Sequence, residues 1–402
     1  MGSPLESGRI RIARILVVAS LIVIGALTLY PVSNTGTSGW YCILCGARAT
    51  ADMILNIILF APLGVALALL RIPFKKVLLV ALLISGLVES AQVLIPGRDA
   101  SIGDLISNTA GCGLGIAVVS SARLWLTPTA TRAGWLSLGA SIVAATLLTL
   151  TGIMLQPSFT ESAYYGQWTP RLGNMERYEG RVLSAEVGSH HLPSGRLDNT
   201  DTVLALLREG NPIRVTAEAG PEPSRLAPLF NIADADQHMI VEIGIEGSDL
   251  VFSQRVRATS FRLDRPTLQI PGALTVSVGD TISIKTWPAE TGRCLVVNLD
   301  RACGLGYTVG FGWALLMYSH TFPIWLQQVL SILWISIVVA PFGFWLRRSA
   351  QSIFGAIILC AGLLLAPGAT GLLATPIAEW TAAGIGLTCG IISRSVIGKL
   401  KT

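Results

Sequence analysis

The sequence predicts an α-helical polytopic membrane protein of about eight transmembrane helices, with an inserted extracytoplasmic antiparallel β-sandwich. Its 402 residues are 51% hydrophobic and only 13% charged, whereas soluble domains are typically about 25% charged. Apolar runs of about 20 residues, the length that crosses a hydrocarbon core, recur at both ends of the chain. The middle segment, residues 157–318, lacks such runs and shows short alternating stretches instead.

The apolar runs divide the chain into membrane and non-membrane parts. We expect spans at Ala13–Tyr30, Met53–Leu70, Val77–Ile95, Ile102–Ser120, Leu136–Leu155, Ile324–Leu346, Ile353–Ala366 and Gly371–Ile392. The first run follows three arginines and ends without a small-residue cleavage site, so it is predicted to be an uncleaved signal-anchor. The expected domains are a four-helix membrane unit (1–125), a fifth transmembrane helix (126–156), the β-sandwich (157–318) and a three-helix membrane unit (319–402).

The basic residues predict the orientation. With the N-terminus inside, thirteen Lys and Arg residues fall in cytoplasmic segments, and only Arg48 and Arg98 fall in short outer loops. Excess basic charge in short loops marks the cytoplasmic side. We therefore expect both termini to be cytoplasmic and residues 157–318 to be extracytoplasmic. The formal charge of +5 is accounted for in this way and gives no reason to expect nucleic acid as a partner.

The middle segment has the pattern of a β-sandwich. Alternation is visible at Ile213–Ala217, Met239–Ile245, Leu274–Val278 and Thr281–Lys285, and turn signals such as Pro271-Gly272 separate these stretches. Short alternating strands at spacings near ten residues are typical of antiparallel sandwiches.

The cysteines add one pairing and one open question. Cys294 and Cys303 flank a predicted hairpin, and an oxidising compartment would allow a disulfide between them. Cys42 and Cys45 form a CxxC motif without a second half-site for zinc or a following His for haem. A local disulfide or two free thiols is favoured over a redox centre. Cys112, Cys360 and Cys389 lie inside apolar runs and are interpreted as packing residues.

Seven polar residues interrupt the second to fourth apolar runs and the loop between the last two: Asp52, Asn56, Glu89, Gln92, Arg98, Asp104 and Asn108. The helical pairs are three or four residues apart, so each pair shares one helix face. Alternating span directions predict a shallow tier of Asp52, Gln92 and Asp104 covered by Arg98. Asn56, Glu89 and Asn108 are expected one turn deeper, with Glu89 between the two carboxamides and Arg98 pairing with Asp52 and Asp104.

Ionisable groups inside a membrane mark function or interhelical pairing. Three acids against one arginine leave an excess of negative charge. Either Glu89 is protonated or a cation binds, and the spacing identifies neither a metal nor another cofactor. The alternative is that these side chains, with the small-residue face Gly111–Gly115, hold the helices together. As a set, the seven residues favour a ligand or reaction site, with Asp52, Glu89, Arg98 and Asp104 as catalytic candidates and Asn56, Gln92 and Asn108 as substrate-binding candidates.

The stretch from Asp52 to Gly115 resembles the VanZ-like family of bacterial membrane proteins. The resemblance rests on Asp52-x-x-x-Asn56, Phe60-x-Pro62-x-Gly64, Glu89-x-x-Gln92, Arg98 in its short loop, and Asp104-x-x-x-Asn108-Thr-x-Gly111-x-x-x-Gly115. It implies a role in the bacterial cell envelope at the cytoplasmic (inner) membrane. The family is named for a protein linked to low-level resistance to the glycopeptide teicoplanin, so the resemblance supplies no reaction.

The middle segment resembles a concanavalin-like or laminin-G-like jelly-roll sandwich at Met239–Leu250, and Gly304–Trp313 resembles a closing strand. That fold often binds glycans on its concave sheet. Trp168, Phe252, Trp287 and Tyr307 are candidates for stacking on sugar rings, although core packing is the favoured interpretation of each.

Three functions remain open from the sequence. The first is an enzyme that acts on a lipid-linked or glycan envelope substrate, with Glu89 or Asp104 transferring a proton and Arg98 holding a phosphate or carboxylate. The second is a non-catalytic scaffold or binding protein for an envelope lipid or polysaccharide. A transporter is disfavoured, because the polar residues stop about halfway across the bilayer. Membrane lipids are partners in every case, and Glu379 in the last span is left without a partner.

Overall fold

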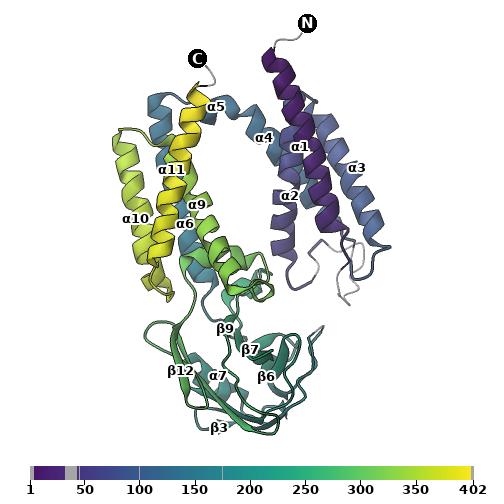
Figure 1. The fold of residues 1–402 in the computed structure, drawn as a ribbon, viewed down its shortest axis with the longest axis vertical. Helices are drawn as coiled ribbons and strands as arrows, with labels where there is room; N and C mark the ends of the chain where they lie inside the picture. The colour runs from purple at the N-terminus through teal and green to yellow at the C-terminus, as the bar shows by residue number, and fades with distance from the viewer. Residues whose placement is uncertain (1–3, 32–42, 45, 99, 174, 400–402) are drawn as a thin grey trace. The chain divides into compact units, whose positions relative to one another are not determined.

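The computed structural model describes residues 4–31, 43–44, 46–98, 100–173 and 175–399 (Figure 1). Cys42 and Cys45 lie outside the described residues. Residue contacts divide the chain into two compact units. Unit 1 comprises Met1–Leu136, Phe261–Leu263 and Val396–Thr402, and unit 2 comprises Ser137–Ser260 and Asp264–Ser395.

Unit 1 is helical. Its elements are α1 (Pro4–Thr28), α2 (Ala49–Leu69), α3 (Phe74–Gln92), α4 (Ile102–Ser120) and the short α5 (Ala122–Leu126). The core between α1, α2, α3 and α4 is apolar, with Ile24, Phe60, Leu63, Val77 and Cys112 all almost fully buried. Ser101 marks the start of α4, because its hydroxyl accepts a hydrogen bond from the backbone N–H of Asp104, as an N-cap residue does.

Helices α2 and α4 approach each other through glycines. A Cβ built on Gly111 would overlap the backbone carbonyl of Ile57, and one on Gly115 would overlap that of Ala61. Helix α2 also contributes a glycine to this contact, because a Cβ on Gly64 would overlap the backbone of Cys112 in α4. Backbone therefore meets backbone along this contact, which is the small-residue packing that joins helices in membranes.

Unit 2 combines a β-sandwich with four long helices, α6 (Ala130–Met154), α9 (Ile324–Trp345), α10 (Ala350–Thr370) and α11 (Ile377–Lys399). The first seven residues of α6 and the last four of α11 fall within unit 1. Leu148 of α6 belongs to one apolar core with Val339 of α9, Leu363 of α10 and Ala382 of α11, all at most 1% exposed. Residues far apart in the sequence thus build one bundle.

Seven helices of the described residues are long and apolar enough to cross a membrane: α1, α2, α4, α6, α9, α10 and α11. The remaining predicted span, Val77–Ile95, corresponds to α3, a helix of 19 residues. Helix α3 is not among these seven helices, and it carries Lys75, Lys76 and Glu89. The chain is a helical membrane protein with an inserted β-sandwich, as predicted.

Two six-stranded sheets form the sandwich, and each pairing within them is antiparallel. One has the order β4-β1-β6-β7-β8-β9 and the other β12-β11-β10-β5-β2-β3. The strands are β1 (Tyr164–Trp168), β2 (Arg181–Val187), β3 (His190–His191), β4 (Gly195–Arg196), β5 (Ile213–Glu218), β6 (Ala227–Asp234), β7 (Met239–Glu246), β8 (Asp249–Gln254), β9 (Leu268–Ile270), β10 (Thr281–Pro288), β11 (Arg293–Val297) and β12 (Asp300–Leu305). Helices α7 (Thr200–Arg208) and α8 (Arg257–Ser260) lie in the connections. The core is built from both sheets, for example by Phe230 and Ile243 of the first and Val215 and Ile284 of the second.

Two expected strands are wrong. Leu274–Val278 is irregular, because turns bound it on both sides and Leu274 donates its backbone N–H to the Ser248 carbonyl at a hairpin turn. Its alternation instead places Leu274 and Val276 against the core.

The expected closing strand Gly304–Trp313 continues only to Leu305. Val309–Leu315 then forms the 3₁₀ helix η1, and Ser319–Thr321 forms a second, η2. Thr308, just before η1, donates its hydroxyl proton to the Glu379 carboxylate. Gly310 lies against the same carboxylate, and Gly312 lies against the ring of Trp334. Glu379, which had no partner in the sequence, therefore fixes η1 against α11.

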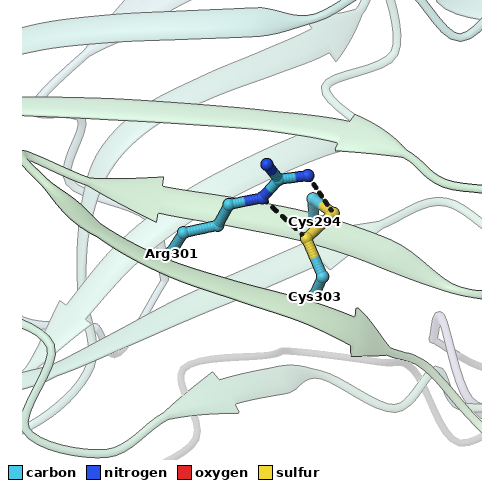
Figure 2. The surroundings of a disulfide bond; sticks show 3 residues. All are labelled: Cys294, Arg301 and Cys303. Carbon is cyan, nitrogen blue, oxygen red and sulfur yellow. Dashed lines mark hydrogen bonds between the residues drawn. A yellow bond between two sulfur atoms is a disulfide. The ribbon is translucent and has the colours of Figure 1, made fainter.

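The predicted disulfide between Cys294 of β11 and Cys303 of β12 is present. Figure 2 shows the Arg301 guanidinium beside it, with Nε 3.1 Å from the Cys303 sulfur. Arg301 also lies over the ring of Trp287, at 5.4 Å from its centroid. The bond joins two paired strands at the edge of their sheet.

Replacing Cys303 with Ser is expected to lower the free energy of unfolding of the sandwich by about 2–3 kcal/mol. The reason is that a loop of roughly ten residues is no longer closed in the unfolded chain. Thermal unfolding of the wild type and the variant measures the loss, and Cys360→Ser, at an exposed free cysteine, is the control. An unchanged transition for C303S, with the wild-type disulfide shown intact by thiol titration, would refute the expectation.

Candidate functional site

All seven predicted site residues belong to unit 1, on α2, α3, α4 and the loop between the last two. They differ in exposure. Glu89 and Asn108 are each 2% exposed and Gln92 is 6% exposed. Asn56, Arg98 and Asp104 are half-buried, and Asp52 is exposed. We call these seven residues the polar cluster.

Asp104 and Asn56 join α4 to α2. The Asn56 side-chain amide donates to Oδ1 of Asp104 at 2.8 Å. Because Asp104 lies in the first turn of α4, its carboxylate also interacts favourably with the helix dipole. This hydrogen bond lies between the two helices that meet through glycines, so the carboxylate is held on a rigid support.

Glu89 is fixed by the start of α4. Its Oε2 accepts a hydrogen bond from the backbone N–H of Ser101 at 2.9 Å. Ser101 therefore has two roles, because its hydroxyl caps α4 while its backbone orients the buried carboxylate. Sequence reasoning missed Ser101 as a site residue. A serine just before an apolar helical run is a capping signal, and that signal was available.

The side-chain amides of Gln92 and Asn108 donate to partners other than Glu89. Gln92 donates to the backbone carbonyl of Thr28 at 3.0 Å, and Asn108 donates to the hydroxyl of Ser85 at 2.9 Å. Glu89 is thus not held between Asn56 and Asn108, contrary to the expectation from spacing. The side-chain carbonyl oxygens of Gln92 and Asn108 are buried and have no hydrogen-bond partner among the described residues.

Arg98 binds the end of α1 and not the carboxylates. Its Nη2 donates to the Leu27 carbonyl at 2.7 Å, and its Nε donates to the Tyr30 carbonyl at 2.9 Å. The last carbonyls of a helix have no partner within it, and a cation there is stabilised by the helix dipole. In the described part of the chain Arg98 makes no ion pair with Asp52 or Asp104, so the expected pairing is wrong. It acts on both only at longer range.

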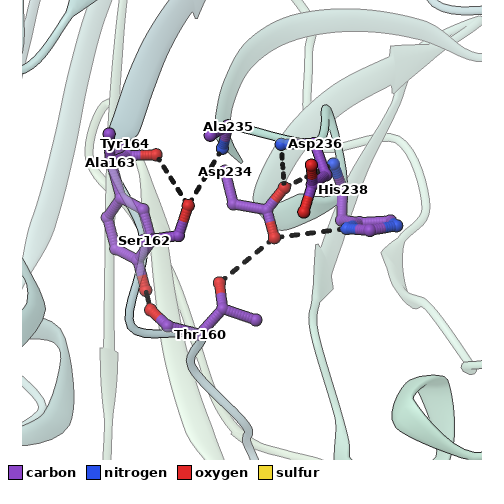
Figure 3. A network of polar contacts seen from close by, with 8 residues as sticks. All are labelled: Thr160, Ser162, Ala163, Tyr164, Asp234, Ala235, Asp236 and His238. Atoms are coloured by element: carbon purple, nitrogen blue, oxygen red, sulfur yellow. Dashed lines mark hydrogen bonds and ion pairs between the residues drawn. The ribbon is translucent and has the colours of Figure 1, made fainter.

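A second group of ionisable residues lies in the turn between β6 and β7, where the ligand atoms of Asp234, Asp236 and His238 are within 4.8 Å of one another. Figure 3 shows that Asp234 organises this turn. Its Oδ1 accepts the backbone N–H groups of Asp236 and His238, and its Oδ2 accepts the Thr160 hydroxyl and contacts the His238 ring. Both carboxylate oxygens are therefore already occupied, and the group is explained by the turn.

The aromatic candidates for sugar stacking are mostly structural. Phe252 is 1% exposed and Tyr307 is 9% exposed, and the Tyr307 hydroxyl donates to the Pro266 carbonyl. Trp168 and Trp287 are half-buried, and the indole N–H of Trp168 donates to the Leu192 carbonyl. Trp168 also packs against the core of the sandwich, so core packing accounts for three of the four.

Comparison with known proteins bears on the N-terminal part of the chain. No curated protein and no solved structure matches the chain. The VanZ/LLP1 family model matches residues 10–125. This stretch is less than half of the 402 residues, but it contains every member of the polar cluster. The N-terminal membrane region is therefore similar to the VanZ/LLP1 family.

Proposed function

We propose that this protein is a VanZ-like integral membrane protein of the bacterial cell envelope, and that its polar cluster binds and processes a lipid-linked or glycan substrate. The observation that carries the proposal is the set of oriented carboxylates inside unit 1. Asn56 fixes Asp104, and Ser101 fixes Glu89. Burying a carboxylate such as that of Glu89 among apolar helices costs several kcal/mol, and helix packing alone does not require it where glycines already join α2 and α4.

The chemistry best suited to this arrangement is proton transfer. General acid and base catalysis requires a carboxyl group held in a defined orientation, and both Glu89 and Asp104 meet that condition. Glu89 is the stronger candidate because it is almost fully buried, away from water that would compete for its proton. Asp52, which is exposed, is assigned to the entrance of the site.

The proposed setting is the cytoplasmic (inner) membrane, with both termini cytoplasmic and residues 157–318 extracytoplasmic. The distribution of basic residues in the short loops supports this orientation. The disulfide between Cys294 and Cys303 also supports it, since disulfides persist in oxidising compartments. The sandwich then lies on the side of the membrane where envelope glycans are assembled, and a polysaccharide is its proposed partner.

Replacing Glu89 with Gln is expected to abolish function without unfolding unit 1. Glutamine retains an oxygen that accepts the Ser101 N–H, but it has no carboxyl proton to transfer. We propose that the protein confers glycopeptide resistance through this site. Since general acid–base catalysis contributes about a hundredfold or more, teicoplanin resistance of the E89Q strain should fall to that of the strain lacking the gene. The measurement is the minimum inhibitory concentration in a deletion strain complemented with each variant.

Glu290→Gln is the matched control, because it makes the same chemical change at an exposed position of the sandwich. Equal membrane levels of the two variants show that folding is preserved. Full resistance in the E89Q strain would contradict the proposed role of Glu89.

A second candidate is a binding protein or scaffold without turnover. It is favoured by the hydrogen bond between Asn56 and Asp104, which joins the same pair of helices as the glycine contacts. The two functions differ in one measurement. Purified protein incubated with lipid-linked envelope precursors leaves their masses unchanged if it only binds, and changes them if it is an enzyme.

A further inference from the structure

Most hydrogen-bond donors of the polar cluster are engaged within unit 1, whereas two of its buried acceptors have no donor among the described residues. We propose that the cluster accepts a non-anionic group rich in hydrogen-bond donors, either sugar hydroxyls or an ammonium, and that it rejects phosphate. This inference rests on the proposed function, because it concerns the ligand of the same site.

Five of the six side-chain nitrogen atoms of the cluster already donate a hydrogen bond within unit 1. The amides of Asn56, Gln92 and Asn108 donate to Asp104, Thr28 and Ser85 respectively. The Nε and Nη2 groups of Arg98 donate to the end of α1. The sequence suggested Arg98 as a phosphate-binding group, and the structure gives it a different task.

Two buried acceptors of the cluster, by contrast, are open. The carbonyl oxygens of Gln92 and Asn108 have no donor among the described residues, although both side chains are more than nine-tenths buried. An unsatisfied buried oxygen is costly. A ligand that donates to these oxygens removes that cost, whereas a phosphate offers only more acceptors.

The two open acceptors lie on different helices, Gln92 on α3 and Asn108 on α4, and Asn108 is held against α3 by its hydrogen bond to Ser85. Ser85, which binds Asn108, is followed by Glu89 four residues later and by Gln92 three residues after that, so all three share one face. The helical rise separates the ends of this row by about 10 Å. That span suits a group with several donors, such as a sugar or an amino sugar, better than a single small ion.

Charge acts in the same direction. Asp52, Glu89 and Asp104 are all carboxylates, and Asp104 interacts electrostatically with both of the others. A phosphate placed among them meets like charges where the dielectric constant is low and repulsion is strong. Neutral hydroxyls avoid this repulsion, and an ammonium is attracted.

The test uses the full chain in phosphatidylcholine nanodiscs and three lipid probes. They are monoglucosyl diacylglycerol for hydroxyls, octadecylamine for an ammonium and phosphatidic acid for a phosphate. Binding is measured for the wild type, Gln92→Leu and Asn108→Leu, with Ser90→Ala as control, since Ser90 is exposed on α3 and bonds only its own helix. Asn108→Asp keeps the side-chain shape if either Leu variant fails to fold.

We expect the glucosyl lipid or the amine to bind at least about tenfold more tightly than phosphatidic acid. Loss of one hydrogen bond in Q92L or N108L should weaken that probe by about tenfold, and N108D should strengthen the amine. The preferred probe identifies the source of the donors. Tighter binding of phosphatidic acid, weakened by N108L, overturns the inference but leaves the proposed site intact. Binding of all three probes that is indifferent to Gln92 and Asn108 also overturns it, and the proposed function then stands or falls on E89Q.

Discussion

Replacing Gly111 with Val is expected to prevent α2 and α4 from packing and to remove most folded protein from the membrane. Any Cβ at this position overlaps the carbonyl of Ile57, and a backbone cannot rotate away as a side chain can. Overpacking costs about 1–3 kcal/mol where side chains can adjust, so a clash with backbone should exceed about 3 kcal/mol. The thermal midpoint and the monodisperse fraction of detergent-solubilised protein report the change.

Gly113→Val in the same helix is the matched control. A Cβ there would meet only the end of the Leu78 side chain, at 3.6 Å, which is ordinary contact distance. The two substitutions share helix propensity and added volume but differ in what the new atoms touch. Equal loss of the folded fraction in both variants would show that helix propensity, and not the contact with α2, is responsible.

Replacing Asp234 with Ala is expected to destabilise the sandwich by about 3 kcal/mol. The substitution removes the acceptor of two backbone N–H groups, those of Asp236 and His238. Each bond to a charged acceptor is worth about 1.5–3 kcal/mol. Hydrogen exchange should show lost protection at these two amides, and thermal unfolding should show the lower stability. Asp236→Ala, at an exposed position of the same turn, should leave the protection of these two amides unchanged. It should alter the free energy of unfolding by no more than about 0.5 kcal/mol.

The same carboxylate predicts a dependence on pH. Burial tends to raise the pKa of Asp234, but the hydrogen bonds and charge of His238 and the bond from Thr160 outweigh it, so the pKa is lowered. A lowered folded-state pKa means that the stabilisation is complete above the unfolded value of about 3.9. It is lost as the pH falls through the folded value. Asp234→Asn should remove this part of the acid sensitivity, and identical acid unfolding of D234N and the wild type would contradict the account.

The architecture was largely predictable because hydrophobic length and alternation are local signals. The long apolar runs became helices, and Thr281–Lys285 became part of β10. The failures occurred where a tertiary contact decided the conformation. Leu274–Val278 alternates like a strand, but it stays irregular, and the backbone N–H of Leu274 bonds the Ser248 carbonyl at a hairpin turn. Gly304–Trp313 leaves the sheet because Thr308 binds Glu379, a residue 71 positions away.

The pairings within the polar cluster were not predictable from the sequence. Helical spacing shows which residues share a face, and it correctly grouped Glu89 with Gln92 and Asp104 with Asn108 on their helices. It contains no information about backbone groups from other helices. Arg98 instead donates to the carbonyls of Leu27 and Tyr30. Glu89 accepts a hydrogen bond from the backbone N–H of Ser101. The spacing of side chains along the sequence does not identify their main-chain hydrogen-bond partners.

The composition of the unit 2 bundle determines the order in which this protein can be completed during synthesis. Helices α1 to α5 occupy one continuous stretch, so their core can close while the rest of the chain is still being made. Helix α6 ends at Met154, and its packing partner α9 begins only at Ile324. The packing of Leu148 is therefore incomplete until the sandwich and the last three helices have been synthesised. Such long-range closure is slow, and we expect truncated or stalled chains to expose α6 as a degradation signal.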